Sequence, residues 1–126
     1  MRAMKKKRIV VIDDCNLTRT ILKDMLEESG YDVVTASSGI EANPYIFAVP
    51  GPALMIIDVE MPMLNGDRKV RLLKEREASR AIPVLLISAK SSAELEKLAA
   101  ASGAEGYLQK PVKKDLVLET VRRYIR

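Results

Sequence analysis

The chain has 126 residues, 48% of them hydrophobic, which is enough to bury the core of one domain. No apolar run approaches the roughly 18 residues that a membrane-spanning helix needs, and the single cysteine, Cys15, excludes an internal disulfide. The net charge of +4 comes with few aromatic residues, which favours a solvated basic surface over a nucleic-acid site. We therefore expect one domain over residues 1–126, with a core over about 6–125. We expect it in the cytoplasm, without membrane insertion or direct nucleic-acid binding.

Five short apolar runs alternate with five segments of helical pattern. In chain order, we expect strands over about 7–12, 32–36, 54–57, 84–87 and 106–109. Short unbroken runs are typical of parallel strands covered on both faces, and right-handed crossovers favour a doubly wound α/β sheet of five strands. The run over 32–36 has the thinnest apolar content, so we place it at an edge.

The first helical segment begins at Asn16 and stops at Gly30. Its apolar residues recur on one face: Leu17, Ile21, Leu22, Met25 and Leu26. Three later helices are expected over about 66–77, 91–102 and 114–125. Ser91 and Glu94 have the spacing of a capping box and open the second of these three.

The helix that follows the second strand has conflicting signals. Ser38 and Glu41 form a capping-box spacing that starts it. Pro44 then interrupts it, because proline lacks a backbone N–H and clashes with the preceding turn. We expect this helix to be short, kinked or restarted at Pro44.

Charged residues and one serine directly follow four of the expected strands. Asp13 and Asp14 come after the first strand, Asp58 after the third, Ser88 after the fourth and Lys110 after the fifth. The carboxyl ends of parallel strands meet at one edge of the sheet, where ligands collect. We therefore expect three carboxylates, a hydroxyl and an ammonium group along one rim.

Taken singly, each of these residues has an ordinary explanation as a turn, a helix cap or a strand end, but their joint occurrence favours phosphoryl transfer. Asp58 is a suitable acceptor, because aspartate carboxylates form covalent phosphoryl intermediates. Three close carboxylates repel one another unless a cation lies among them, and Mg²⁺ prefers such oxygen ligands. Lys110 and Ser88 supply a charge and a donor for phosphoryl oxygens.

This constellation resembles the receiver domain of two-component response regulators, in the manner of the chemotaxis response regulators. The matching stretches are Asp13-Asp14 with Arg19, Asp58-Val59-Glu60-Met61-Pro62 through Gly66, Ser88-Ala89, and Tyr107-Leu108-Gln109-Lys110-Pro111. The resemblance covers about residues 6–125. It implies a flavodoxin-like receiver fold with strand order 2-1-3-4-5, and a phosphorylatable switch in a phosphorelay rather than a turnover enzyme.

The resemblance implies an acceptor and a metal site. Asp58 would be the phosphoacceptor and would also contact the metal. Asp14 would bind Mg²⁺ directly, with Mn²⁺ as a substitute, and Asp13 would bind it mostly through water. The backbone carbonyl of Glu60 would complete the protein ligands.

The resemblance also implies a set of residues that respond to the phosphoryl group. Lys110 would pair with it, and the Lys110–Pro111 peptide bond is expected to be cis. Ser88, in place of the usual threonine, would move toward it, with Ala89 beside it. Tyr107 either turns inward behind Ser88 or is an ordinary half-buried strand residue.

Two features distinguish this chain within the family, and only the first concerns the acceptor site. Glu60 and Lys90 occupy positions that set the lifetime of the phosphoryl group in such proteins, and we expect an ion pair between them that hinders attacking water. Asp67-Arg68-Lys69 replaces the usual apolar and acidic opening of the helix over 66–77, so the geometry there is an open question.

The chain contains no histidine, so a phosphohistidine donor must be a partner, either a sensor histidine kinase or a histidine-phosphotransfer protein. In this family the fourth helix, fifth strand and fifth helix form the switching face, which would contact a downstream protein target or a second copy. Two alternatives stay open. One is a Mg²⁺-dependent phosphatase with an aspartate nucleophile, in which Glu60 stands where a general acid is usual. The other is an interaction module that works without phosphorylation.

Overall fold

The computed structural model describes residues 5–125, so Arg126 and residues 1–4, which the domain prediction includes, lie outside it. The strands are β1 (Arg8–Ile12), β2 (Asp32–Ala36), β3 (Leu54–Asp58), β4 (Val84–Ser88) and β5 (Gly106–Gln109). The helices are α1 (Asn16–Glu28), α2 (Gly39–Ile46), α3 (Gly66–Glu75), α4 (Ser92–Ser102) and α5 (Lys114–Tyr124). Over residues 5–125 no helix has the length and apolar character needed to cross a bilayer.

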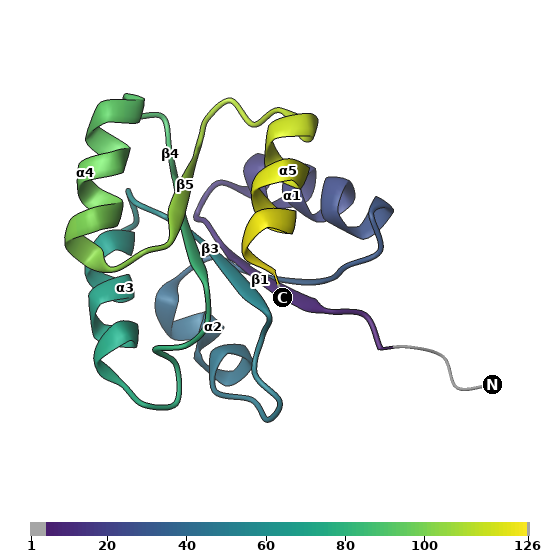
Figure 1. Ribbon diagram of the computed structural model, residues 1–126, viewed down its shortest axis with the longest axis horizontal. Coiled ribbons are helices and arrows are strands. Elements are labelled where there is room, and N and C mark those ends of the chain that lie inside the picture. Colours follow the sequence, from purple (N-terminus) through teal and green to yellow (C-terminus); the bar gives the residue numbers. More distant parts are fainter. Residues whose placement is uncertain (1–4, 126) are drawn as a thin grey trace.

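The five strands form one parallel sheet in the order β2-β1-β3-β4-β5, which confirms the predicted fold and the edge position of β2. Helices α3 and α4 lie on one side of this sheet and α1 and α5 on the other (Figure 1). The strands are in close register at their carboxyl ends, since Asp58 of β3 pairs with Ile87 of β4, and Ser88 pairs with Gln109 of β5. The residues that follow the strands therefore emerge along one edge.

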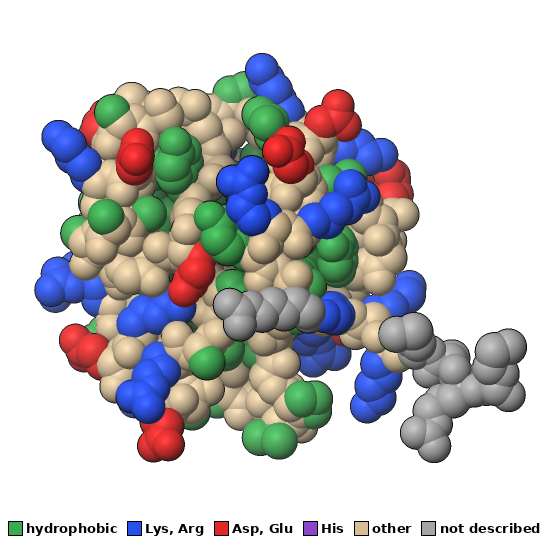
Figure 2. All heavy atoms as spheres, in the orientation of Figure 1, with side chains coloured by type: hydrophobic (Ala, Val, Ile, Leu, Met, Phe, Trp, Pro, Cys, Tyr) green, Lys and Arg blue, Asp and Glu red, His purple; other side chains and the backbone are tan. Residues whose placement is uncertain are grey.

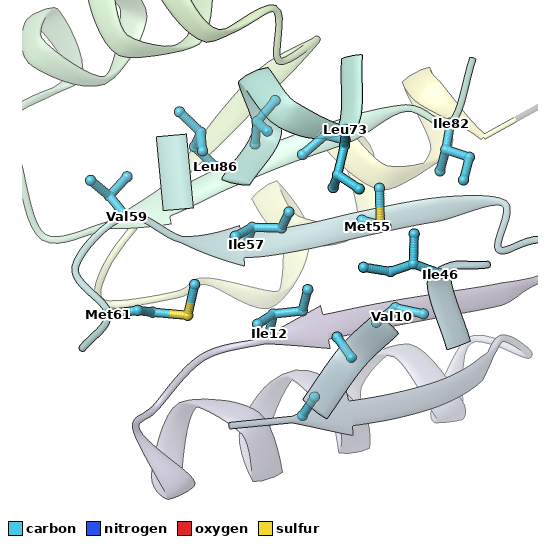
Figure 3. Packing of buried hydrophobic residues seen from close by; sticks show 14 of the residues in the cluster. Val10, Ile12, Ile46, Met55, Ile57, Val59, Met61, Leu73, Ile82 and Leu86 are labelled. Carbon is cyan, nitrogen blue, oxygen red and sulfur yellow. The ribbon is translucent and has the colours of Figure 1, made fainter. Parts of the chain in front are cut away.

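The sheet buries a hydrophobic layer on each face, because successive side chains of a strand point to opposite sides. On one face, residues such as Val10, Ile57 and Leu86 pack with α2, α3 and α4 (Figure 3). On the other, alternate strand residues pack with α1 and α5. Each fully buried aliphatic side chain contributes about 1.5–3 kcal/mol, so two complete layers give the strands a firm frame.

The helix signals in the sequence correspond to observed caps. Ser38 and Ser91 each accept a hydrogen bond from the backbone N–H three residues later, at 3.1 and 3.2 Å. Gly103 ends α4 in the left-handed region with φ 89°, as the C-cap position requires. One expectation about α1 is wrong: Leu17 is 67% exposed, because it lies in the first turn, beyond the layer that buries Leu22 and Leu26.

Helix α2 is short, as expected, and continues through Pro44. A contact that the sequence did not indicate joins it to α3: the Lys69 ammonium donates to Oδ1 of Asn43 at 2.7 Å. Lys69 is only 9% exposed, and this burial lowers the pKa of its ammonium. Its side-chain carbons lie close to Gly39, so Lys69 fills space between α2 and α3.

The basic excess is spread over the surface. On the face shown in Figure 2, Lys and Arg side chains alternate with Asp and Glu side chains and do not gather into one patch. Several cations are paired, including Arg8 with Asp32 and Lys74 with Glu105, at 2.8 and 2.9 Å. This distribution agrees with a solvated surface.

Gly66, the first residue of α3, lies against the end of β3. Its N–H donates to the carbonyl of Val59 at 2.8 Å, so the chain folds tightly back onto the strand. A Cβ atom at Gly66 would overlap the carbonyl oxygen of Asp58 and would lie 3.0 Å from Ile57 Cγ2. The lack of a side chain at Gly66 thus allows the loop to hold Asp58 at the edge of the sheet.

We predict that Gly66→Ala lowers the free energy of unfolding by about 2–4 kcal/mol, because the added methyl must displace the Asp58 backbone. The measurement is urea denaturation followed by circular dichroism. Gly51→Ala is the matched control, since its nearest neighbours lie at 3.6–3.7 Å and ordinary contact results. Equal stability of the two variants would show that the close approach at Gly66 does not constrain the fold.

Candidate functional site

Three carboxylates converge at the carboxyl edge of the sheet. Asp13 and Asp14 follow β1, and Asp58 ends the neighbouring strand β3. One oxygen from each of the three lies within 4.8 Å of the others. Asp13 is fully buried and Asp58 is 2% exposed, whereas Asp14 is exposed to solvent. The site is therefore a buried pair of carboxylates with a third at its mouth.

Lys110 brings the positive charge to this site. It follows β5, its N–H donates to the carbonyl of Ser88 at 2.8 Å, and the Lys110–Pro111 peptide bond is cis. Its ammonium lies 3.0 Å from Oδ2 of Asp13 and 3.6 Å from Oδ1 of Asp58. One cation thus faces the two buried carboxylates.

The β1–α1 loop is fixed around Asp13 by its own hydrogen bonds. Oδ1 of Asp13 accepts from the N–H of Cys15 at 2.8 Å. The guanidinium of Arg19 donates to the carbonyl of Asp13 at 2.6 Å and to Asn16 at 3.2 Å. Arg19 was included in the family resemblance without a role, and here it anchors the backbone that carries the two aspartates.

Burial and charge shift the titration of the central groups. Burial, then the neighbouring Asp13 charge, raises the pKa of Asp58 from 3.8 to about 7, although Lys110 opposes the shift. Burial disfavours the Lys110 ammonium, but the contact with Asp13 and the charges of Asp13 and Asp58 outweigh it and raise its pKa above 10.5. The carboxylates therefore favour the charged form of Lys110. The positive charge of Lys110 is too little to offset the burial of Asp58 and its repulsion by Asp13, so the pKa of Asp58 stays raised.

Two buried oxygens of this group bear on whether a cation fits the site. Oδ2 of Asp13 and Oδ1 of Asp58 accept no hydrogen bond within the described chain, although the Lys110 ammonium lies 3.0 and 3.6 Å from them. Buried carboxylate oxygens normally have partners, and hard oxygen ligands grouped in this way suit Mg²⁺. The acidic group of Asp13, Asp14 and Asp58 therefore fits a divalent cation.

Ser88 makes an interaction that the sequence did not indicate. Its hydroxyl is fully buried at the end of β4 and donates to the Glu60 carboxylate, at 2.8 Å from Oε1 and 2.9 Å from Oε2. The expected ion pair between Glu60 and Lys90 is present but longer, at 3.7 Å. Glu60 therefore binds the candidate switch hydroxyl more closely than it binds Lys90. Its spacing from Ser88 along the chain gave no signal of this contact.

The remaining candidate residues lie at the end of β4 and within β5. Ala89 is exposed after β4, and Tyr107 is half-buried on β5, where it packs against the core cluster on the α4 side. Tyr107 also lines a groove of about 930 Å³ over α4, β5 and α5, together with Lys110. The structure thus connects the site to the predicted switching face through β5.

We predict that Asp58→Asn raises the free energy of unfolding in metal-free buffer near neutral pH, by about 1–3 kcal/mol. The raised pKa means that the folded state binds the Asp58 proton more tightly than the unfolded state. The wild type should therefore lose stability as the pH rises from 3.8 to about 7, and the variant should lack this loss. Urea denaturation at a series of pH values measures the difference.

Asp24→Asn is the control for this prediction, because it removes a carboxylate that is exposed on α1. Its stability should follow the wild type within about 0.5 kcal/mol at every pH. If Asp58→Asn differed from the wild type by the same amount below and above this pH window, the Asp58 charge would not be the cause.

Comparison with known proteins agrees with this arrangement. Residues 9–122 match the model of the response regulator receiver domain. The chain is 29% identical over 119 residues to the polar-differentiation response regulator DivK of Brucella ovis, covering 94% of this chain and 96% of that protein. The solved structure of the chemotaxis response regulator CheY4 of Vibrio cholerae is 27% identical, with a TM-score of 0.87, and covers 96% of this chain and 100% of that one. A response regulator receiver protein from Pseudomonas putida is 26% identical with a TM-score of 0.83, over 96% and 99% of the two chains. The chain belongs to the response regulator receiver family of two-component signalling.

Proposed function

We propose that this protein is a phosphorylatable switch whose acceptor is Asp58. The observation that supports it best is the group of Asp13, Asp14 and Asp58 with Lys110 beside it, at the carboxyl edge of the sheet. Such a group provides a nucleophile, metal ligands and a fixed positive charge, which are the parts that phosphoryl transfer needs. We treat the described chain as one receiver domain that acts in the cytoplasm.

The phosphoryl donor is a phosphohistidine of a sensor histidine kinase or a histidine-phosphotransfer protein. A carboxylate oxygen of Asp58 attacks the phosphorus atom, the new P–O bond forms as the P–N bond breaks, and the imidazole leaves and takes up a proton from solvent. Lys110 stays charged and pairs with a phosphoryl oxygen. The exposed Leu17 on α1, close to the β1–α1 loop, supports α1 as part of the docking surface for the donor.

The metal ligands would be Asp14 directly, Asp13 mostly through water, one oxygen of Asp58 and the backbone carbonyl of Glu60. Mg²⁺, or Mn²⁺ in its place, supplies positive charge that offsets the carboxylates and the phosphoryl oxygens when it is bound. The two oxygens of Asp13 and Asp58 that accept no hydrogen bond from residues 5–125 support this assignment.

The response would begin at Ser88, Ala89 and Lys110, which lie at the ends of β4 and β5, and Tyr107 would follow the movement of Ser88. The groove over α4, β5 and α5 is the surface through which a downstream protein target, or a second copy of the chain, would read the change. Glu60 and Lys90 form an exposed ion pair at 3.7 Å. We assign this pair an influence on the lifetime of the phosphoryl group, because it would hinder the attacking water.

Incubation with acetyl phosphate and Mg²⁺ should add the mass of one phosphoryl group to the intact protein, because a carboxylate at this position can attack a small phosphoryl donor. Intact mass spectrometry measures the gain. Omission of Mg²⁺, with a chelator present, should abolish it, and so should Asp58→Asn.

Two outcomes would contradict the proposal. A gain of equal size in Asp58→Asn would place the acceptor on another residue. No gain in the wild type, together with no stable binding of beryllofluoride in the presence of Mg²⁺, would rule out the phosphorylation switch. Beryllofluoride binding without a mass gain would instead indicate hydrolysis faster than detection.

A further inference from the structure

The hydroxyl of Ser88 is already engaged in the unphosphorylated protein. It donates to both oxygens of the Glu60 carboxylate, at 2.8 and 2.9 Å, and accepts from the N–H of Lys90 at 3.1 Å. A serine hydroxyl carries a single proton. The bond to Glu60 therefore uses the only donor that Ser88 has to offer to a phosphoryl oxygen on Asp58.

Glu60 is held in this position by Ser88 more than by Lys90. Its side chain is 54% exposed and lies two residues after Asp58, yet its carboxylate reaches the buried end of β4. The Lys90 ammonium lies at 3.7 Å, in a pair exposed on both sides, and such pairs contribute little. The hydroxyl–carboxylate bond is short, charge-assisted and partly shielded from water, so it is the stronger of the two.

We propose that Glu60 is a latch: it retains the Ser88 hydroxyl in the unphosphorylated state, and a phosphoryl group on Asp58 must displace it before the protein switches. This inference rests on the proposed function. A phosphoryl group on Asp58 replaces the single carboxylate charge with about two negative charges, a net gain of about one, and adds three acceptor oxygens. It competes with the Glu60 carboxylate for one proton and repels that carboxylate at the same time.

The latch changes what Ser88 contributes to switching. If the hydroxyl were free, its bond to the phosphoryl group would favour the switched state in full. Here that bond replaces another charge-assisted bond, so only the difference between the two favours switching. Glu60 is a positioning residue in this scheme, because it acts through Ser88 and not on the reacting atoms.

A double-mutant cycle tests the latch by calorimetric titration with beryllofluoride in the presence of Mg²⁺, which reports binding at equilibrium and is independent of phosphoryl lifetime. Glu60→Ala should bind beryllofluoride about tenfold more tightly than the wild type, equivalent to about 1.4 kcal/mol. In a Ser88→Ala background the same substitution should tighten binding much less, because the proton for which the anions compete is absent and only the relief of charge repulsion remains.

Glu75→Ala is the matched control, since it removes one exposed carboxylate at the end of α3 and should bind like the wild type. Equal tightening by Glu60→Ala with and without Ser88 would mean that Glu60 acts through its charge alone and would overturn the latch. Unchanged or weaker binding by Glu60→Ala with Ser88 present would overturn it as well. If neither the wild type nor any variant bound beryllofluoride, the proposed function would fail and the latch with it.

Discussion

The site depends on an imbalance of charge: three carboxylates meet at one edge of the sheet, and Lys110 is the cation that contacts the two buried ones. Burying like charges close together lowers stability. The same burial and repulsion disfavour the ionised form of Asp58 and so raise its pKa. The cost is tolerated because hydrophobic layers on both faces of the sheet hold β1 and β3 side by side. The core thus keeps Asp13 and Asp58 together against their mutual repulsion.

The geometry of this charge cluster is fixed mainly by backbone contacts. The N–H of Cys15 and the guanidinium of Arg19 hold the loop that carries Asp13, and the N–H of Gly66 closes the loop after Asp58. The missing side chain at Gly66 leaves room for the Asp58 carbonyl. Rigid placement of this kind lets a change in charge at Asp58 act on neighbouring side chains rather than being absorbed by loop movement.

The five strands, the helix caps and the meeting of the acidic residues with Lys110 were predictable from the residues themselves, because hydrophobic periodicity, capping-box spacing and the ends of parallel strands are local signals. The strand order came from the family resemblance. Long-range side-chain contacts outside these signals and outside the family resemblance were not predictable. A lysine on the first turns of α3 gives no sign that it will be buried against Asn43 of α2. Leu17 has the right helical spacing for the core but lies one turn beyond the layer that the sheet covers.

The contact between Glu60 and Ser88 was likewise not predictable from the sequence. It joins the loop after Asp58 to the end of β4. Ser88 also accepts from the N–H of Lys90, and the side chain of Gln109 donates to the Lys90 carbonyl at 3.0 Å. The loop between β4 and α4 is therefore tied to Ser88 on one side and to β5 on the other. If the Ser88 hydroxyl leaves Glu60 for a phosphoryl oxygen on Asp58 as proposed, the loop would respond through its bond to the Lys90 N–H, and Ser91, the next residue, caps α4. The proposed competition for one proton would thereby act on the start of α4, where the proposed switching face begins.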